Sequence, residues 1–301
     1  MKKLYSTLFI VLLIYSTHAL DYKHIIVDTE VFYRIQSHNC YATRIYDRDG
    51  NQYIVKQYKH GEFSLMAATT ICELVALDLG HAVGVLLNEA CLIPSGVPFM
   101  AKEFNSLPAT VHTFVEGVRY DKYQGNVYKN IVLYQSPNVG LTREIIKSMA
   151  CHKNLPALVA LDTFVGNIDR GSYNYFYNVE TNSFIGIDLG GAFSCNLCKA
   201  SVHTLEALLQ NDQIYFTVDE KEALAHYYAT LEKLVALFPA HKINQLLDDY
   251  AQESQLFDTR FFSNKVQKKW KRFLHRCKQH IQNSGESALL LLDVISQLLD
   301  K

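Results

Sequence analysis

The sequence lacks several features that mark particular classes of protein. Its seven cysteines are odd in number and scattered, so they do not form the framework of a small disulfide-rich domain. No Asn-x-Ser/Thr acceptor for N-glycosylation occurs, which favours a bacterial protein over a eukaryotic secretory one. Charge of neither sign is in excess, because 29 Lys and Arg face 30 Asp and Glu. The net charge of the whole chain therefore indicates no partner.

Cys195 and Cys198 form a C-x-x-C pair without the second pair that a zinc site of this type needs. We expect two small apolar residues there, with a local disulfide as the alternative and a zinc site as the weakest interpretation.

The N-terminus has the pattern of a secretory signal peptide. Two lysines, Lys2 and Lys3, precede an apolar run at residues 8–15, and small residues at 17–19 come before the charged Asp21. The run is shorter than the about 20 residues that a transmembrane helix needs. The pattern predicts a cleaved signal peptide at residues 1–19 and a secreted protein. The alternatives are an uncleaved anchor and a buried first strand.

The remaining chain is long and apolar enough to bury a large core, since 49% of the 301 residues are hydrophobic. Its first part alternates with the period of strands, and its second part with that of helices. We therefore expect an α+β fold with a small β-rich N-terminal lobe at residues 20–105 and a larger helical C-terminal lobe at residues 106–301. Strands are expected at residues 31–35, 41–46, 52–58, 85–93 and 97–104.

Two charged residues of the N-terminal part stand at apolar positions. Lys56 ends the strand at residues 52–58, and Glu73 lies within a helix expected at residues 62–79, whose end Gly80 would mark. Because an unpaired buried charge is costly, we expect these two side chains to pair. Each also has a plainer interpretation as a solvated surface residue.

After residue 140 the sequence predicts helices, whereas residues 106–140 are expected to be irregular. Thr142 and Asn154 are candidate N-caps for two helices, the second at residues 155–165. Further helices are expected at residues 202–210, 219–238, 240–253, 259–281 and 286–299.

Residues 166–193 carry the clearest chemical signal. Asp169 lies in a loop, and a β-hairpin then brings Asn174 and Asp188 beside each other. Two oxygen ligands for a hard cation and a carboxylate for the attacking hydroxyl are what magnesium-nucleotide phosphoryl transfer requires. Asp and Asn also favour turns for local reasons, so the order of elements along the chain is what strengthens this prediction.

The motifs Gly-Asn-Ile-Asp-Arg-Gly-Ser-Tyr-Asn at residues 166–174 and Ile-Asp-Leu-Gly at residues 187–190 resemble those of the protein-kinase-like superfamily. They are most similar to the phosphatidylinositol 3-/4-kinase-like branch, and the Gly-Asn-x-Asp loop is shared with HipA-like toxin kinases. The resemblance implies ATP and Mg²⁺ as cofactors and a two-lobed kinase-like fold. Its order of elements covers roughly residues 31–250.

The resemblance also implies roles for individual residues. Asp169 would be the catalytic aspartate, and Arg170 would neutralise charge on the transferring phosphoryl group. Asn174 and Asp188 would bind magnesium. Lys56 would bind phosphate and would itself be held by Glu73.

The remaining cofactor contacts would come from two stretches of the N-terminal lobe. A loop at residues 36–40, with Ser37 and Asn39, would cover the phosphates. Glu103 and Phe104 would lead into a hinge at residues 105–108 that binds adenine through its backbone. The phosphate loop has no glycine, and Gly171 stands where the family usually has histidine. A catalytically inactive homologue therefore stays an alternative.

A basic segment near the C-terminus suggests a partner. Residues 259–283 carry eight Lys or Arg and no Asp or Glu, so the rest of the chain is net acidic. Basic residues beside Trp270 and Phe273 on one helix suit an anionic membrane surface. The alternative is a helix whose apolar face packs inward and whose lysines are solvated. No nucleic-acid-binding fold accompanies the segment.

We expect from these features an exported kinase that acts on a phosphoinositide. A protein serine/threonine kinase and a pseudokinase that binds a partner are the alternatives. Because ATP is scarce outside cells, an exported kinase would act inside a host cell as an effector.

Overall fold

The computed structural model describes most of the chain from residue 33 onward. The described residues are 33–36, 40–58, 66–95, 108–116, 118–119, 140–171, 174–178, 180–211, 215–258, 260 and 262–301. The predicted signal peptide at residues 1–19 lies outside them.

The N-terminal part is a five-stranded antiparallel sheet in the order β1-β2-β3-β5-β4. Its strands are β1 (Tyr33–Gln36), β2 (Cys40–Tyr46), β3 (Gln52–Tyr58), β4 (Ala90–Ile93) and β5 (Ala109–Thr113). A small core of Ile45, Val55, Ile93, Ala109 and Val111 lies against one face of the sheet. Strands β2 and β3 form an antiparallel hairpin, with Gly50 at φ 83° in its turn.

Helix α2 (Met66–Ala82) separates β3 from β4. Gly80 does not end this helix, as the sequence suggested, but lies inside it. A Cβ atom at Gly80 would stand 2.3 Å from Leu87 Cδ1 and 2.7 Å from Leu161 Cδ2. The glycine therefore allows close packing of α2 against the C-terminal part.

The stretch at residues 106–140 is not irregular throughout, which corrects the prediction. It contains β5, which pairs with both β3 and β4, and β6 (Val118–Arg119), which pairs with β7 of a second sheet. The chain thus passes from the first sheet to the second through residues 114–116, later than the hinge expected at residues 105–108. The expected strand at residues 97–104 lies outside the described residues.

Two helices precede the second sheet. Thr142 caps α3 (Arg143–Ala150) by accepting from the N–H of Ile145, as predicted. Helix α4 (Leu155–Val165) has the predicted bounds, but Asn154 does not cap it. The Asn154 side chain instead exchanges hydrogen bonds with the backbone of Phe184 and so attaches the hairpin to the helix.

The predicted hairpin is present as β7 (Tyr175–Asn178) and β8 (Ser183–Gly186), which form a three-stranded sheet with β6. Gly186 N–H donates to Leu86 O at 3.1 Å, which joins the hairpin to the segment after α2. Ile187 N–H donates to Asn174 O at 3.1 Å, so the two ends of the hairpin lie side by side.

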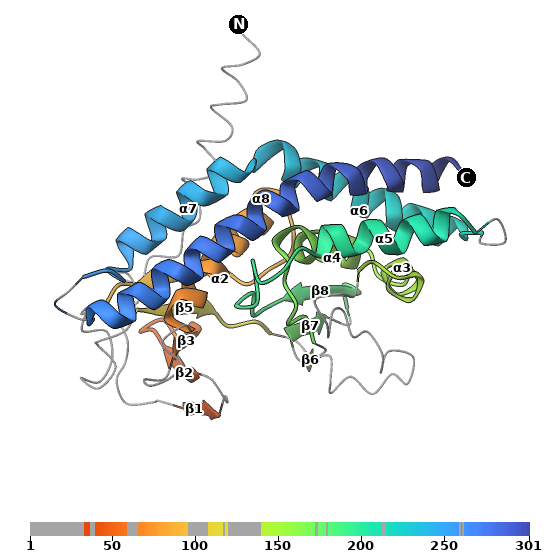
Figure 1. The fold of residues 1–301 in the computed structure, drawn as a ribbon. Coiled ribbons are helices and arrows are strands. Elements are labelled where there is room, and N and C mark those ends of the chain that lie inside the picture. The colour runs from red at the N-terminus through yellow and green to blue at the C-terminus, as the bar shows by residue number, and fades with distance from the viewer. Residues whose placement is uncertain are drawn as a thin grey trace, which may run out of the picture.

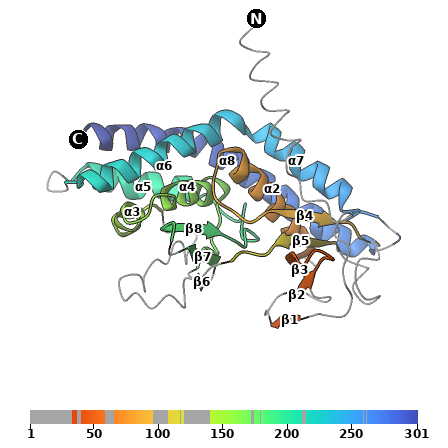
Figure 2. The same cartoon turned by 180° about the vertical axis from the view of Figure 1, so that it is seen from behind.

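Four helices, α5 (Leu197–Leu209), α6 (Val218–Leu237), α7 (Ala240–Glu253) and α8 (Asn264–Asp300), complete the chain. Helix α8 is one helix of 37 residues, not the two that were expected. It runs along the molecule from the side of β5 to the side of α5 and α6 (Figures 1 and 2). Its apolar positions continue through Gly285 from Ile281 to Ala288, so burial maintains the helix across the expected break.

The architecture is therefore the predicted α+β class, with a small β-rich part followed by a larger helical part. The main core contains buried side chains from helix α2, from all the helices α3 through α8, and from the β7–β8 hairpin. Among the described helices, none has the combination of length and low charge that crossing a bilayer demands.

One contact between α2 and α7 predicts a pH dependence of stability. Tyr250 OH donates to Asp78 Oδ2 at 2.8 Å, and burial raises the pKa of Asp78 to about 6. The folded form retains this proton to a higher pH than the unfolded form. The stability that Asp78 contributes is therefore complete below about pH 4 and is lost as the pH rises through about 6.

We expect Asp78→Asn to raise the free energy of unfolding at pH 7 by about 1–2 kcal/mol and to flatten its decline between pH 4 and 6. The amide keeps an acceptor for Tyr250 and removes the buried charge. Urea unfolding across this pH range is the measurement. The control is Asp293→Asn at an exposed position of α8, which should change stability little. A destabilised Asp78→Asn variant with the wild-type pH slope would contradict the prediction.

Candidate functional site

Three predicted residues from separate elements meet at one point. The Nζ atom of Lys56 on β3 lies 2.9 Å from Oε1 of Glu73 on α2 and 3.4 Å from Oδ1 of Asp188 after β8. The pairing of Lys56 with Glu73 that the sequence predicts is formed. Asp188 was predicted separately, and the structure places its carboxylate on the same ammonium group.

Glu73 is almost completely buried, with 1% of its side chain exposed. Burial raises the pKa of Glu73, while Lys56 opposes that rise. Its second oxygen, Oε2, finds no hydrogen-bond partner within the described part of the chain and faces His112 Nε2 at 3.9 Å. Burial and then Lys56 lower the pKa of His112, so this ring is neutral at pH 7. The Lys56–Glu73 pair therefore lies against a buried, neutral histidine of β5.

Asp188 has a different environment. Its backbone adopts φ 56°, which is the left-handed region, and 40% of its side chain is exposed. Lys56 is the main cause that lowers the pKa of Asp188, helped by Arg170 and by a hydrogen bond from the backbone of Gly190. The carboxylate is therefore ionised at neutral pH and partly accessible, and ionised carboxylates are oxygen ligands that hard cations prefer.

The loop that carries Asp169 begins at the end of α4. Gly166 ends the helix at φ 63°, and a Cβ atom there would stand 2.0 Å from Cys195 O, so the position requires glycine. Asn167 is buried, donates to Asp162 Oδ1 at 2.8 Å and accepts from the N–H of Asp169 at 3.2 Å. The loop backbone is thus held while the Asp169 side chain lies at the surface.

Arg170 does not have the expected position. Its side chain is 0% exposed, and it forms a two-pronged ion pair with Asp162 at 2.7 and 2.9 Å. Its remaining Nη1 donates to the carbonyls of Asn174 and Ile187 at 2.8 and 2.6 Å. The prediction that Arg170 neutralises a transferring phosphoryl group is therefore wrong, because the side chain is buried and each of its three nitrogens donates to a group inside the protein. Arg170 instead joins the loop to both ends of the hairpin.

Asn174 lies at the start of the hairpin, where its backbone carbonyl accepts from the N–H of Ile187, the residue before Asp188. Its side chain is buried, and its Nδ2 donates to the backbone carbonyl of Asp169. Because the nitrogen is used in this bond, the amide oxygen is the atom that a metal would bind. Among the described residues there is no group of three or more His, Cys, Asp and Glu arranged for a metal. An Asn–Asp pair would leave the other positions of Mg²⁺ to phosphate and water, as is usual for this ion.

Four predicted cofactor-binding residues, Ser37, Asn39, Glu103 and Phe104, lie outside the described residues. Their roles stay predictions. The described crossing between the two sheets lies at residues 114–116, where Arg44 stacks on the Phe114 ring with 4.4 Å between the guanidinium carbon and the centroid.

Sequence reasoning missed Asp162 and Gly191. Asp162 is the one charged residue in the otherwise apolar helix α4, and the argument used for Glu73 would have predicted a buried partner for it as well. Gly191 gave no such signal. A Cβ atom there would lie 2.6 Å from Asn167 Oδ1 and 3.0 Å from Asp169 Cβ. The need for glycine at this position therefore comes from tertiary packing.

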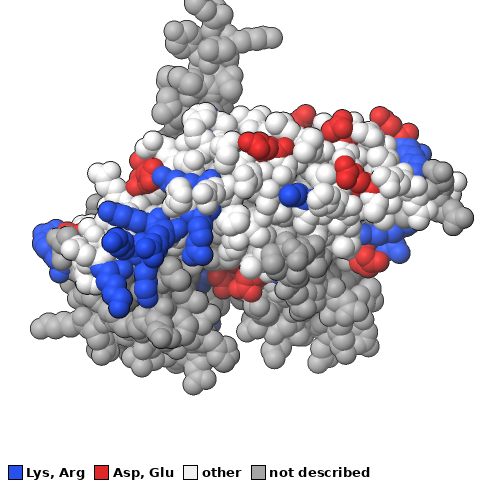
Figure 3. Space-filling view, viewed as in Figure 1, with Lys and Arg blue, Asp and Glu red and all other residues white. Residues whose placement is uncertain are grey.

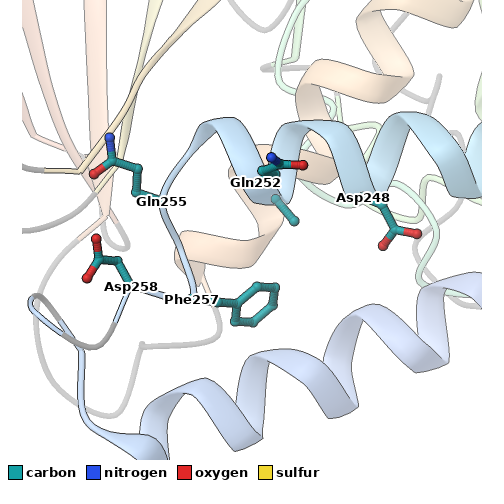
Figure 4. Close-up of a pocket in the computed structure, with 6 residues that line it drawn as sticks. Asp248, Gln252, Gln255, Phe257 and Asp258 are labelled. Carbon is teal, nitrogen blue, oxygen red and sulfur yellow. The ribbon is translucent and has the colours of Figure 1, made fainter.

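A separate hollow lies between the end of α7 and α8 (Figure 4). Its volume is about 420 Å³, and its lining includes Asp248, Phe257 and Asp258. Both carboxylates already have cations as partners, because Lys278 contacts Asp248 at 2.6 Å and Arg260 contacts Asp258 at 2.6 Å. None of the predicted site residues lines the hollow, so we do not regard it as the candidate functional site.

The basic segment is confirmed as a helix, but its apolar face is not free for a membrane. Trp270, Leu274, Cys277 and Ile281 are buried in the main core. The basic residues stay at the surface, where Lys and Arg gather over the N-terminal half of α8 (Figure 3). We name Lys265, Lys268, Lys269, Arg272 and Arg276, all of them exposed, the α8 basic surface.

No protein-family model and no curated protein matches this chain. Similar solved structures include the Rio2 kinase–ADP/Mg²⁺–phosphoaspartate complex from Chaetomium thermophilum, at 12% identity and TM-score 0.39, over 84% of this chain and 72% of that one. Amicoumacin kinase hAmiN with AMP-PNP, Ca²⁺ and Ami has 12% identity and TM-score 0.30, over 85% and 90%. The open conformation of CtTel1 has 14% identity and TM-score 0.43, over 92% of this chain and 12% of CtTel1. At such values these likenesses carry no inference about chemistry.

The packing of Gly191 against the Asp169 loop predicts a large effect of one methyl group. We expect Gly191→Ala to lower the free energy of unfolding by about 1–3 kcal/mol, because the new Cβ must displace Asn167 and the loop backbone. The matched control is Gly285→Ala, which meets nothing within 4 Å in the middle of α8 and should raise stability by about 0.5–1 kcal/mol. Urea unfolding measures both. A shift of the two variants in the same direction would refute the steric explanation.

Proposed function

We propose that this chain is an ATP- and Mg²⁺-dependent phosphotransferase that transfers a phosphoryl group to an alcohol. The observation that carries this proposal is the position of Lys56, whose ammonium contacts Glu73 and Asp188 from two other elements at 2.9 and 3.4 Å. The buried carboxylate of Glu73 holds the Lys56 ammonium beside the accessible carboxylate of Asp188. A lysine in this position could bind the phosphates of a nucleotide whose metal ion is bound by Asp188.

In the proposed reaction the attacking hydroxyl gives its proton to Asp169, and its oxygen forms the bond to the terminal phosphorus while ADP leaves. Lys56 binds the phosphates of the nucleotide, and Glu73 holds its ammonium group in place. Asp162, Arg170 and Asn167 act through the loop backbone and keep Asp169 in place.

Asp188 and the amide oxygen of Asn174 would hold the magnesium ion, whose charge would neutralise the phosphate oxygens. The donor set fits a hard cation, since the carboxylate is ionised and the amide is oriented by its bond to the Asp169 carbonyl.

As substrate we propose the hydroxyl of a phosphoinositide. The α8 basic surface supports this choice, because an anionic lipid layer attracts such a surface with about 1 kcal/mol per basic residue. The burial of Trp270 and its neighbours means that this attraction would be electrostatic, without insertion of the helix. A protein hydroxyl is the alternative substrate, and a pseudokinase is the alternative without chemistry.

We also propose that the protein is exported and meets ATP inside a host cell. This proposal rests on the charged, apolar and small-residue pattern of residues 1–19. Localisation by cell fractionation tests it, and confinement of the protein to the bacterial periplasm would contradict it.

We expect the mature protein to transfer label from γ-labelled ATP in Mg²⁺ to mixed phosphoinositides. Asp169→Ala and Asp188→Ala should each lower the rate at least about 10³-fold, because the first removes the proton acceptor and the second a metal ligand. Asp293→Ala on the exposed face of α8 is the control. Label in host-cell protein instead of lipid would show that the substrate is a protein hydroxyl and not a phosphoinositide. No label despite correct folding, or activity that survives either aspartate variant, would end the proposal.

Binding to anionic vesicles tests the role of the α8 basic surface. Relative to wild type, we expect the triple variant Lys268→Glu/Lys269→Glu/Arg272→Glu to lose at least about 10-fold in affinity for phosphatidylserine-containing vesicles. The matched control reverses three exposed lysines elsewhere, Lys147, Lys153 and Lys199, and should retain most of the binding. Wild-type binding should fall steeply with salt. An equal loss of vesicle affinity in the two triple variants would contradict the proposal that the α8 basic surface is the membrane-binding site.

A further inference from the structure

Two cysteines meet in the core between α2 and α8. The Sγ atoms of Cys72 and Cys277 lie 3.8 Å apart, although 205 residues separate them in sequence. The two residues are 0% and 2% exposed. Bonded sulfurs are about 2.05 Å apart, so a bond requires a little under ~2 Å of approach. Rotation of the two side chains and a shift of the helices would supply this movement as the bond forms.

The C-x-x-C cysteines provide a contrast. Cys195 Sγ donates to Gly166 O and Cys198 Sγ to Thr163 O, so the two thiols bond to the end of α4 rather than to each other. Burial raises the pKa of Cys195 to about 11, which keeps this thiol protonated. They are small buried residues, as the sequence suggested. In Cys72 and Cys277, by comparison, each sulfur has the other as its neighbour.

We propose that Cys72 and Cys277 form a disulfide that joins α2 to α8 when the chain folds in the presence of a disulfide oxidant. The two S–H bonds are replaced by one S–S bond. Two protons and two electrons pass to a small-molecule disulfide such as oxidised glutathione, which leaves as two thiols. Because both sulfurs are buried, the bond forms during folding and is afterwards shielded from reductants.

The cross-link would act on the candidate site through α2. Cys72 directly precedes Glu73, and neighbouring helical residues point about 100° apart. One of them therefore contacts α8 while the other reaches Lys56. A bond at Cys72 restricts movement of α2 at the residue next to the one that holds Lys56. The cross-link itself does not depend on the proposed phosphotransfer.

The test uses the full chain, refolded in a mixture of reduced and oxidised glutathione and, in parallel, in dithiothreitol. Free thiols are blocked with N-ethylmaleimide in denaturant, and the digest is analysed by mass spectrometry. We expect a peptide that joins Cys72 to Cys277 in most molecules of the first sample. The thermal midpoint of that sample should exceed that of the reduced one by about 5–10 °C, because the bond closes a long loop.

Cys277→Ser should abolish both the joined peptide and the difference in midpoint, whereas Cys91→Ser on β4 should retain both. The measurement on the wild-type chain stands even if a variant fails to fold. Labelling of Cys72 and Cys277 as free thiols after oxidative folding, pairing of either with another cysteine, or equal midpoints with and without dithiothreitol would each overturn the proposal.

Discussion

The buried ion pair between Asp162 and Arg170 is the interaction on which the candidate site depends. Both side chains are 0% exposed, and such a pair stabilises a structure only when its hydrogen bonds are complete. Here Arg170 also donates to the backbone carbonyls of Asn174 and Ile187, and Asp162 also accepts from Asn167. The pair therefore connects α4, the Asp169 loop and both hairpin ends. Removing either partner would leave a buried charge in the middle of the site.

The second ion pair, between Lys56 and Glu73, has the opposite character. One of its members is buried, but Lys56 also contacts the accessible carboxylate of Asp188. Lys56 contacts carboxylates from two elements, whereas each of the three side-chain nitrogens of Arg170 donates to a group inside the protein. The site thus combines an interior pair that holds the backbone with a second pair whose lysine also reaches an accessible carboxylate.

Much of this site could be predicted because a charge in an apolar segment requires a partner and because a hairpin brings its ends together. These two rules locate Lys56, Glu73, Asn174 and Asp188. The role of Arg170 could not be predicted, since its sequence position beside Asp169 gives no information on Asp162 in the preceding helix. Strand β5 and the continuity of α8 through Gly285 were missed for the same reason. Both depend on partners distant in sequence.

The length of α8 has a mechanical consequence. At about 1.5 Å per residue its 37 residues form a rod of roughly 55 Å. Helix α2 packs against this rod and against α4 and α7, all of which belong to the helical part. Helix α2 also packs against β3, β4 and β5, so it joins the first sheet to the helical part. The ion pair between Lys56 on β3 and Glu73 on α2 lies at this junction, so a displacement of the sheet along the rod would change the distance between the two side chains.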